Sequence, residues 1–212
     1  ALNRLRSCPI RPGTLAVVTD NPYRLPRAVL PHHYTLALEP DLAAATFVGH
    51  VIIDATVSEA VGRIVLNAIE LEVSEVKVDG ETVPFALHEP TERLEILKAH
   101  EQGTVTIEIT FSGILNDKLH GWYRSTYVDN DGAQQVIATT QMQATDCRRA
   151  FPCFDEPDFK AVFDITLIIE PHLLAVSNGP EIERADRESL TEKGVDGKGD
   201  KVAVRFAETM PM

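Results

Sequence analysis

Apolar and polar residues alternate along most of this chain, and this period of two restricts the possible fold more than any other feature. The clearest case is Thr104–Phe111, whose apolar members are Val105, Ile107, Ile109 and Phe111. Side chains that repeat every two residues share one face of a β-strand, whereas a helical face repeats every three to four. No segment shows the helical period for longer than a turn. The sequence therefore predicts an all-β domain of several packed sheets, with a β-sandwich-like architecture.

Eleven segments have the composition or alternation of strands and are separated by turn signals. They are His33–Leu38, Phe47–Val57, Arg63–Ala68, Leu71–Val78, Thr82–Leu87, Arg93–Leu97, Thr104–Phe111, Trp122–Val128, Gln135–Thr140, Phe163–Ile169 and Val202–Phe206. Asp79-Gly80 is a strong hairpin signal, from which we expect Thr82–Leu87 to return. We expect Arg93–Leu97 to pair with Thr104–Phe111 through a turn at Gln102-Gly103.

Two irregularities stand within the alternating segments. The phase of the alternation slips inside Leu71–Val78, and both a bulge and two short strands would account for it. In Phe47–Val57 we expect Val51, Ile53, Ala55 and Val57 to share one face. Gly49 interrupts this segment, and an isolated glycine within a strand often marks a bulge. We therefore predict a bulge at Gly49 and leave the two alternatives open at the slip.

Composition limits the class of protein. The chain has 212 residues, of which 44% are hydrophobic, so it can form a core rather than stay disordered. Its net charge of −12 disfavours nucleic acid and anionic membranes as partners. No apolar run approaches the roughly 18 residues of a membrane-spanning helix. We expect residues 1–21 to form a tail, residues 22–212 one β domain, and residues 183–200 a solvated hairpin loop.

The chain contains three cysteines, Cys8, Cys147 and Cys153. This odd, low count does not fit a disulfide framework, and it favours a reducing, cytoplasmic location. Cys147 and Cys153 could approach each other, or could bind a metal together with a remote histidine. Buried free thiols are the commoner case, so we expect no metal site in this chain.

The catalytic motifs that we searched for are missing from the sequence. A zinc peptidase helix needs two histidines four residues apart, with a glutamate beside the first. His88 and His100 are each followed by a glutamate, but Glu92 and Thr104 occupy the positions of the second histidine. There is no Gly-x-Ser-x-Gly motif and no phosphate-binding loop. We therefore expect no catalytic residue in these 212 residues.

The stretch Thr139–Pro157 (TTQMQATDCRRAFPCFDEP) does not alternate, and it concentrates polar groups beside two phenylalanines. Its charged residues are Asp146, Arg148, Arg149, Asp155 and Glu156. We expect them to form ion pairs that hold a structured, partly buried turn over a sheet. Thr145 or Asp146 would cap a single helical turn there.

This stretch resembles the N-terminal domain of the M1 zinc aminopeptidases, most closely the aminopeptidase N type. Five further runs share the likeness: His33–Pro40, Gly121–Tyr127, Phe163–Leu167, Ala175–Pro180 and Thr209–Met212. The second of these has Trp122 where the family usually has phenylalanine. The resemblance covers about residues 22–212 and implies a saddle-shaped β structure.

The resemblance also implies a function for the whole protein. In the family, a thermolysin-like zinc domain follows, so zinc belongs to the full-length enzyme and its ligands lie outside this chain. The implied partners are that C-terminal catalytic domain and peptides with a free N-terminus. In this resemblance Gln143 holds the substrate's α-amine and Gln141 forms part of the same pocket wall.

Two alternatives remain at this point. Related β domains occur in non-catalytic scaffold proteins that have lost zinc chemistry, so the chain could be a binding module. An epoxide-hydrolysing relative of these peptidases is a third possibility. The presence of Gln141 and Gln143 favours the peptidase over a scaffold, and the run Phe151–Pro157 is closer to the aminopeptidases than to the epoxide hydrolase.

Overall fold

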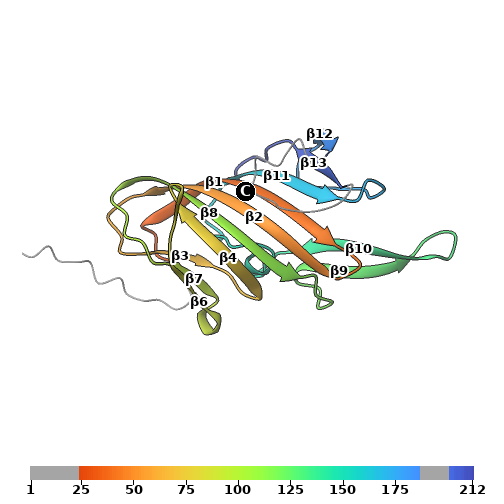
Figure 1. Ribbon diagram of the computed structural model, residues 1–212, viewed down its shortest axis with the longest axis horizontal. Helices are drawn as coiled ribbons and strands as arrows, with labels where there is room; N and C mark the ends of the chain where they lie inside the picture. Colours follow the sequence, from red (N-terminus) through yellow and green to blue (C-terminus); the bar gives the residue numbers. More distant parts are fainter. Residues whose placement is uncertain (1–23, 187–200) are drawn as a thin grey trace, which may run out of the picture.

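The computed structural model of the chain describes residues 24–186 and 201–212 (Figure 1). Within these residues strands dominate, which confirms the all-β prediction. The helical pieces in the same residues are two single 3₁₀ turns, η1 (Glu89–Thr91) and η2 (Cys147–Arg149). No helix of the described part is long and apolar enough to cross a membrane. The predicted tail at 1–21 and most of the predicted loop, 187–200, lie outside the described residues.

The largest sheet has eight strands in the order β12-β13-β11-β1-β2-β8-β4-β5. In that order they are Glu181–Asp186, Val202–Phe206, Val162–Ile169, Val29–Asp41, Thr46–Val57, Gly103–Ile114, Leu71–Val78 and Glu81–Thr82. Neighbours are antiparallel except β1 and β11, which are parallel. Long strands β1, β2 and β8 form the centre of this sheet (Figure 1).

Two smaller sheets accompany the large one. β3 (Ile64–Asn67), β7 (Arg93–Ile96) and β6 (Phe85–His88) form a three-stranded sheet. β9 (Gly121–Val128) and β10 (Gln134–Gln141) form a hairpin, which projects from the body at the right of Figure 1. The two strands confirm those predicted at Trp122–Val128 and Gln135–Thr140, and Gly132 N donates to Asp129 O at 3.1 Å in the turn between them.

The core lies between the large sheet and the three-stranded sheet. The predicted inward residues of β2 and β8 are all buried: Val51, Ile53, Ala55, Val57, Val105, Ile107, Ile109 and Phe111. From the small sheet, the fully buried residues are Ile64, Leu66, Leu94 and Ile96. Burial of the apolar side chains that these two sheets turn toward each other stabilises the fold by roughly 25 cal/mol per Å² of apolar area.

One predicted strand pairing is wrong, and a second holds only at Thr82, which pairs with Lys77 of β4. β7 pairs with β3 and β6, whereas β8 pairs with β2 and β4. Because β8 has partners along both edges, it offers β7 no free edge. The predicted strand Thr82–Leu87 is likewise two strands, β5 and β6, which belong to different sheets. Pro84 separates them, since proline has no N–H to donate to a sheet.

The local turn chemistry was predicted more successfully. Asp79 and Gly80 both have positive φ, 53° and 80°, as a tight two-residue hairpin turn requires. The phase slip in β4 is a bulge, located between Val73 and Glu75. The bulge predicted at Gly49 is absent, because Gly49 pairs in regular register with Phe111. The absence of a side chain at Gly49 instead leaves space for the Phe111 ring.

Candidate functional site

The segment between β10 and β11, residues 142–161, forms an irregular layer that is anchored in the core. Phe151, Phe154 and Phe159 are buried there. Cys153 exchanges two backbone hydrogen bonds with Asn67 at the end of β3, with N···O distances of 2.8 and 3.1 Å. The sequence prediction of a structured, partly buried turn is therefore confirmed.

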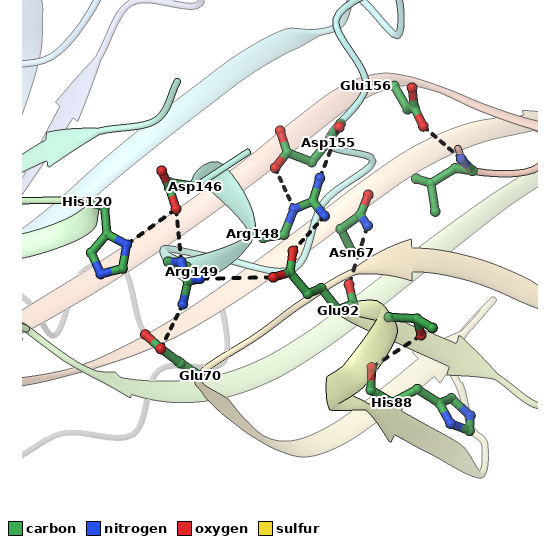
Figure 2. Close-up of polar contacts among 12 residues, drawn as sticks. Asn67, Glu70, His88, Glu92, His120, Asp146, Arg148, Arg149, Asp155 and Glu156 are labelled. Carbon is green, nitrogen blue, oxygen red and sulfur yellow. Dashed lines mark hydrogen bonds and ion pairs between the residues drawn. The ribbon is translucent and has the colours of Figure 1, made fainter. Parts of the chain in front are cut away.

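Arg148 joins this layer to the small sheet (Figure 2). Its Nε donates to Asp155 Oδ2 at 2.8 Å, and its Nη1 donates to Glu92 Oε2 at 3.0 Å. Arg148 and Asp155 are largely shielded from water, whereas the Glu92 side chain is one-third exposed. Burial alone would lower the pKa of Arg148, but Asp155 and Glu92 have the larger combined effect, so the pKa of Arg148 is raised. The guanidinium therefore remains charged and fixes η2 relative to η1.

Arg149 makes a second set of ion pairs on the other side of η2 (Figure 2). Its Nε donates to Asp146 Oδ1 at 2.9 Å, and its Nη1 lies 2.8 Å from Glu70 Oε1. Asp146 Oδ1 also lies 3.4 Å from Nδ1 of His120. A Cβ at Gly121 would lie 2.7 Å from Arg149 Cβ, so only glycine lets the start of β9 pack this closely.

These contacts confirm the interpretation of the charged residues as ion pairs that hold the loop. Glu156 adds a third tie, since it accepts from the Leu25 backbone N–H at 2.7 Å and pairs with Arg24 at 2.8 Å. The predicted helix cap is wrong: Asp146 occupies the position before η2, but no side chain caps the turn. The Asp146 carboxylate accepts from Arg149 instead.

Gln141 and Gln143 lie side by side at the exposed edge of this layer. Gln141 ends β10, opposite Gly121, and both glutamine side chains are exposed. The side-chain amide of Gln141 donates a long hydrogen bond, 3.4 Å, to the backbone carbonyl oxygen of Gln143. Asp146 N donates to Met142 O at 2.9 Å and closes the turn that contains Gln143. The two predicted site residues are thus brought together on a turn that the ion pairs hold.

Several residues that position this turn could not be identified from the sequence. Glu70 and Glu92 supply partners for the arginines, yet Glu92 lies 56 residues from Arg148 and no local pattern connects them. Tyr34 is predicted only as a strand residue. Its buried hydroxyl accepts a hydrogen bond from the Phe154 backbone N–H at 3.1 Å, while its ring stacks on Phe163 at 4.7 Å. A tyrosine on the core face of a strand would have been the signal, because a buried hydroxyl needs a partner.

Tyr34→Phe is expected to lower the free energy of unfolding by about 1–3 kcal/mol. The ring and its stacking on Phe163 remain, but the buried Phe154 N–H loses its acceptor. Urea unfolding of the chain measures the change. Tyr127→Phe is the matched control, because Tyr127 is 50% exposed. Equal stability of the two variants would contradict a structural role for the Tyr34 hydroxyl.

Cys147 and Cys153 also meet in this layer, and both are free thiols. Cys153 is buried and Cys147 half-buried. Burial raises the pKa of the Cys153 thiol well above its ordinary range, and the neighbouring Cys147 adds to the effect. The approach of the two cysteines considered in the sequence is therefore confirmed, and Asp155 lies beside them.

Comparison with known proteins decides the family. The model of the peptidase M1 N-terminal domain matches residues 30–212, most of the chain. The chain belongs to the peptidase M1 N-terminal domain family. The resemblance of Thr139–Pro157 to this family is thereby confirmed.

Three aminopeptidases illustrate the relationship. Aminopeptidase 2 of Candida albicans is 39% identical over 185 residues, which are 85% of this chain and 20% of the relative. Aminopeptidase M1-A of Oryza sativa subsp. japonica is 41% identical over 76% of this chain and 19% of the relative. Endoplasmic reticulum aminopeptidase 1 of Rattus norvegicus is 35% identical over 77% of this chain and 19% of the relative. The chain thus spans about a fifth of the length of these relatives.

Proposed function

We propose that this chain is the N-terminal domain of a zinc metallo-aminopeptidase that removes N-terminal amino acids from peptides. In this proposal the domain supplies part of the pocket for the substrate's free α-amine and is not itself catalytic. One observation supports it above the others: Gln141 and Gln143 lie together, exposed, on a turn held from two sides by the Arg148 and Arg149 ion pairs. Because the chain belongs to a peptidase family, we take the ligand of that turn to be the N-terminus of a peptide substrate.

The chemistry of the two amides suits this task. An exopeptidase must bind a protonated amine and leave no room for residues that precede it. The carbonyl oxygen of the Gln143 side chain can accept hydrogen bonds from an ammonium group, as can that of Gln141. Such bonds strengthen where water is excluded, as it would be beneath a second domain. Because an amide is neutral, carboxylates elsewhere would supply most of the charge complementarity.

The rigidity of the turn matters as much as its donors and acceptors. A group that binds substrate is most effective when the protein holds it in place before binding. The turn that contains Gln143 is closed by the backbone N–H of Asp146, and the Asp146 side chain is held by Arg149. Arg149 in turn is anchored by Glu70 from a different part of the chain. This connection leads from the loop between β3 and β4 to the proposed amine site.

The zinc of the proposed enzyme would be held outside this chain. No residues here match the His-Glu-x-x-His pattern. The proposed partners are therefore a C-terminal catalytic domain and peptides with a free N-terminus. The cytoplasmic location inferred from the cysteine count stays a prediction.

An activity assay tests the proposed function. We expect the complete gene product to hydrolyse an aminoacyl nitroanilide but not its N-acetylated form, and the 212-residue chain to hydrolyse neither. Hydrolysis by the 212-residue chain would contradict its non-catalytic role. Failure of the complete gene product to hydrolyse the unblocked substrate would contradict the enzyme and favour the scaffold alternative.

A further inference from the structure

Three potential metal ligands lie together in η2 and in the segment that follows it. They are Cys147, Cys153 and Asp155, and their two sulfur atoms and nearest carboxylate oxygen all lie within 4.8 Å of one another. No histidine belongs to this group in the described residues. From the sequence, the two cysteines could bind a metal only with a remote histidine, and Asp155 is expected only to form ion pairs. The third ligand becomes visible only in the fold.

Each of the three residues is held by contacts of its own. The carbonyl oxygen of Cys147 accepts from Ala150 N at 2.9 Å, and the backbone of Cys153 is bonded on both sides to Asn67. Asp155 Oδ2 accepts from Arg148 Nε at 2.8 Å. A site whose ligands are already fixed loses little conformational entropy when a cation binds.

The donor set selects a class of cation. Thiolates favour zinc and other soft metals over magnesium or calcium, and a carboxylate oxygen completes a mixed sulfur and oxygen set. In a tetrahedral zinc site, bonds of about 2.3 Å to sulfur and 2.0–2.2 Å to oxygen put two sulfurs and one oxygen about 3.5–3.8 Å apart. The present set, with all separations within 4.8 Å, needs to contract by no more than about 1.3 Å to reach that geometry. Solvent, reaching the site from the half-buried Cys147, can supply a fourth ligand.

The surrounding charges fit the same class. Two thiolates and the carboxylate of Asp155 would place three negative charges around one point, and the Arg148 guanidinium contacts the Asp155 carboxylate. A divalent cation would compensate the remaining negative charge. Arg148, which donates to Asp155, would then act as an outer partner that orients the carboxylate.

We propose that Cys147, Cys153 and Asp155 bind one thiophilic divalent cation of the zinc and cadmium class, with the two thiol protons released to solvent. This site revises the expectation that the chain contains no metal ligands. Because Cys147 begins η2, the bound cation would also hold the turn that presents Gln143. The site itself stands on the three ligands and does not depend on the proposed amine-binding role.

Titration with cadmium tests the site. The chain is prepared with Cys8→Ser, so that only Cys147 and Cys153 remain, and is kept reduced with a phosphine. We expect about one cadmium per chain by metal analysis, together with a thiolate-to-metal absorption band and protection of both thiols from alkylation. Cys147→Ala and Cys153→Ala should each remove the band. No binding, or binding that survives loss of both cysteines, would overturn the proposal.

Asp155 needs a matched control, because it both pairs with Arg148 and is proposed as a ligand. Asp155→Asn and Glu92→Gln each remove one carboxylate from Arg148, but only the first alters the metal site. We expect Asp155→Asn to weaken cadmium binding about tenfold or more, and Glu92→Gln to leave it nearly unchanged. Equal effects of the two variants would exclude Asp155 as a ligand. Should Cys153→Ala fail to fold, the half-buried Cys147→Ala decides the role of the thiols.

Discussion

In the complete protein, Gln143→Ala is expected to lower kcat/KM for unblocked peptides by about ten- to a hundredfold and to leave folding nearly intact. A hydrogen bond to a charged group contributes about 1.5–3 kcal/mol, which corresponds to that range. The Gln143 side chain is exposed, so its removal opens no cavity in the core. Steady-state kinetics and a thermal melt on one preparation measure both effects.

Whether the loss in kcat/KM appears in kcat or in KM shows at which stage of the reaction Gln143 holds the amine. If the amine is held equally in the ground state and in the transition state, the loss appears mainly in KM. Gln143→Glu should be tolerated better than alanine, because glutamate keeps an acceptor and attracts the ammonium. Gln134→Ala is the matched control, because Gln134 is an exposed glutamine at the opposite end of β10. A lower melting temperature with unchanged kcat/KM would show that Gln143 only supports its own loop.

The fold shows which properties a strand pattern determines. Alternation identified the buried faces of β2 and β8 correctly, because a residue's face depends only on its own position along a strand. It did not identify partners, since every strand with one apolar face fits the same description. β7 was therefore paired wrongly with β8, whose two edges are occupied by β2 and β4.

For the candidate site, too, local features could be predicted from the sequence but long-range partners could not. A dense cluster of charges beside prolines and phenylalanines indicated a held turn, and the arginines do form ion pairs. The sequence could not show that Glu70 and Glu92 supply partners from distant turns, because long-range pairing leaves no local pattern. For the same reason it could not show that Asp155 lies beside both cysteines. The role of Gln143 was suggested by family resemblance and stays a proposal.

Gly49 shows how a correct sequence signal can have a different cause from the one inferred. Two aromatic and glycine pairs lie next to each other between β2 and β8, namely Phe47 opposite Gly113 and Phe111 opposite Gly49. Each phenylalanine is only 2% exposed. A Cβ at Gly49 would lie 2.4 Å from Cζ of Phe111, and one at Gly113 would lie 2.4 Å from Cζ of Phe47. The glycines thus provide the space that the two rings occupy.

Gly49→Val is consequently expected to lower the free energy of unfolding by about 3 kcal/mol, at the upper end of the usual range for overpacking. Two effects oppose each other at this position. Replacing glycine within a strand gains about 0.5–1 kcal/mol from backbone entropy, and valine is a good strand former. The side chain must also fit where the Phe111 ring lies, in the middle of three paired strands that cannot move apart without breaking hydrogen bonds. The cost of this steric overlap exceeds the gain in backbone entropy, so the substitution destabilises the fold.

Three further variants separate this explanation from a general intolerance of substitution at glycine. Gly62→Val should change stability by less than about 0.5 kcal/mol, because a Cβ at Gly62 meets no atom within 4 Å. Phe111→Leu should relieve the overlap, so we expect the double variant with Gly49→Val to lose at least about 1 kcal/mol less than the sum of the single losses. Urea unfolding of the unsubstituted chain, Gly49→Val, Phe111→Leu and the double variant measures this coupling. Additive losses would show that Gly49 is required for some reason other than the space taken by the Phe111 ring.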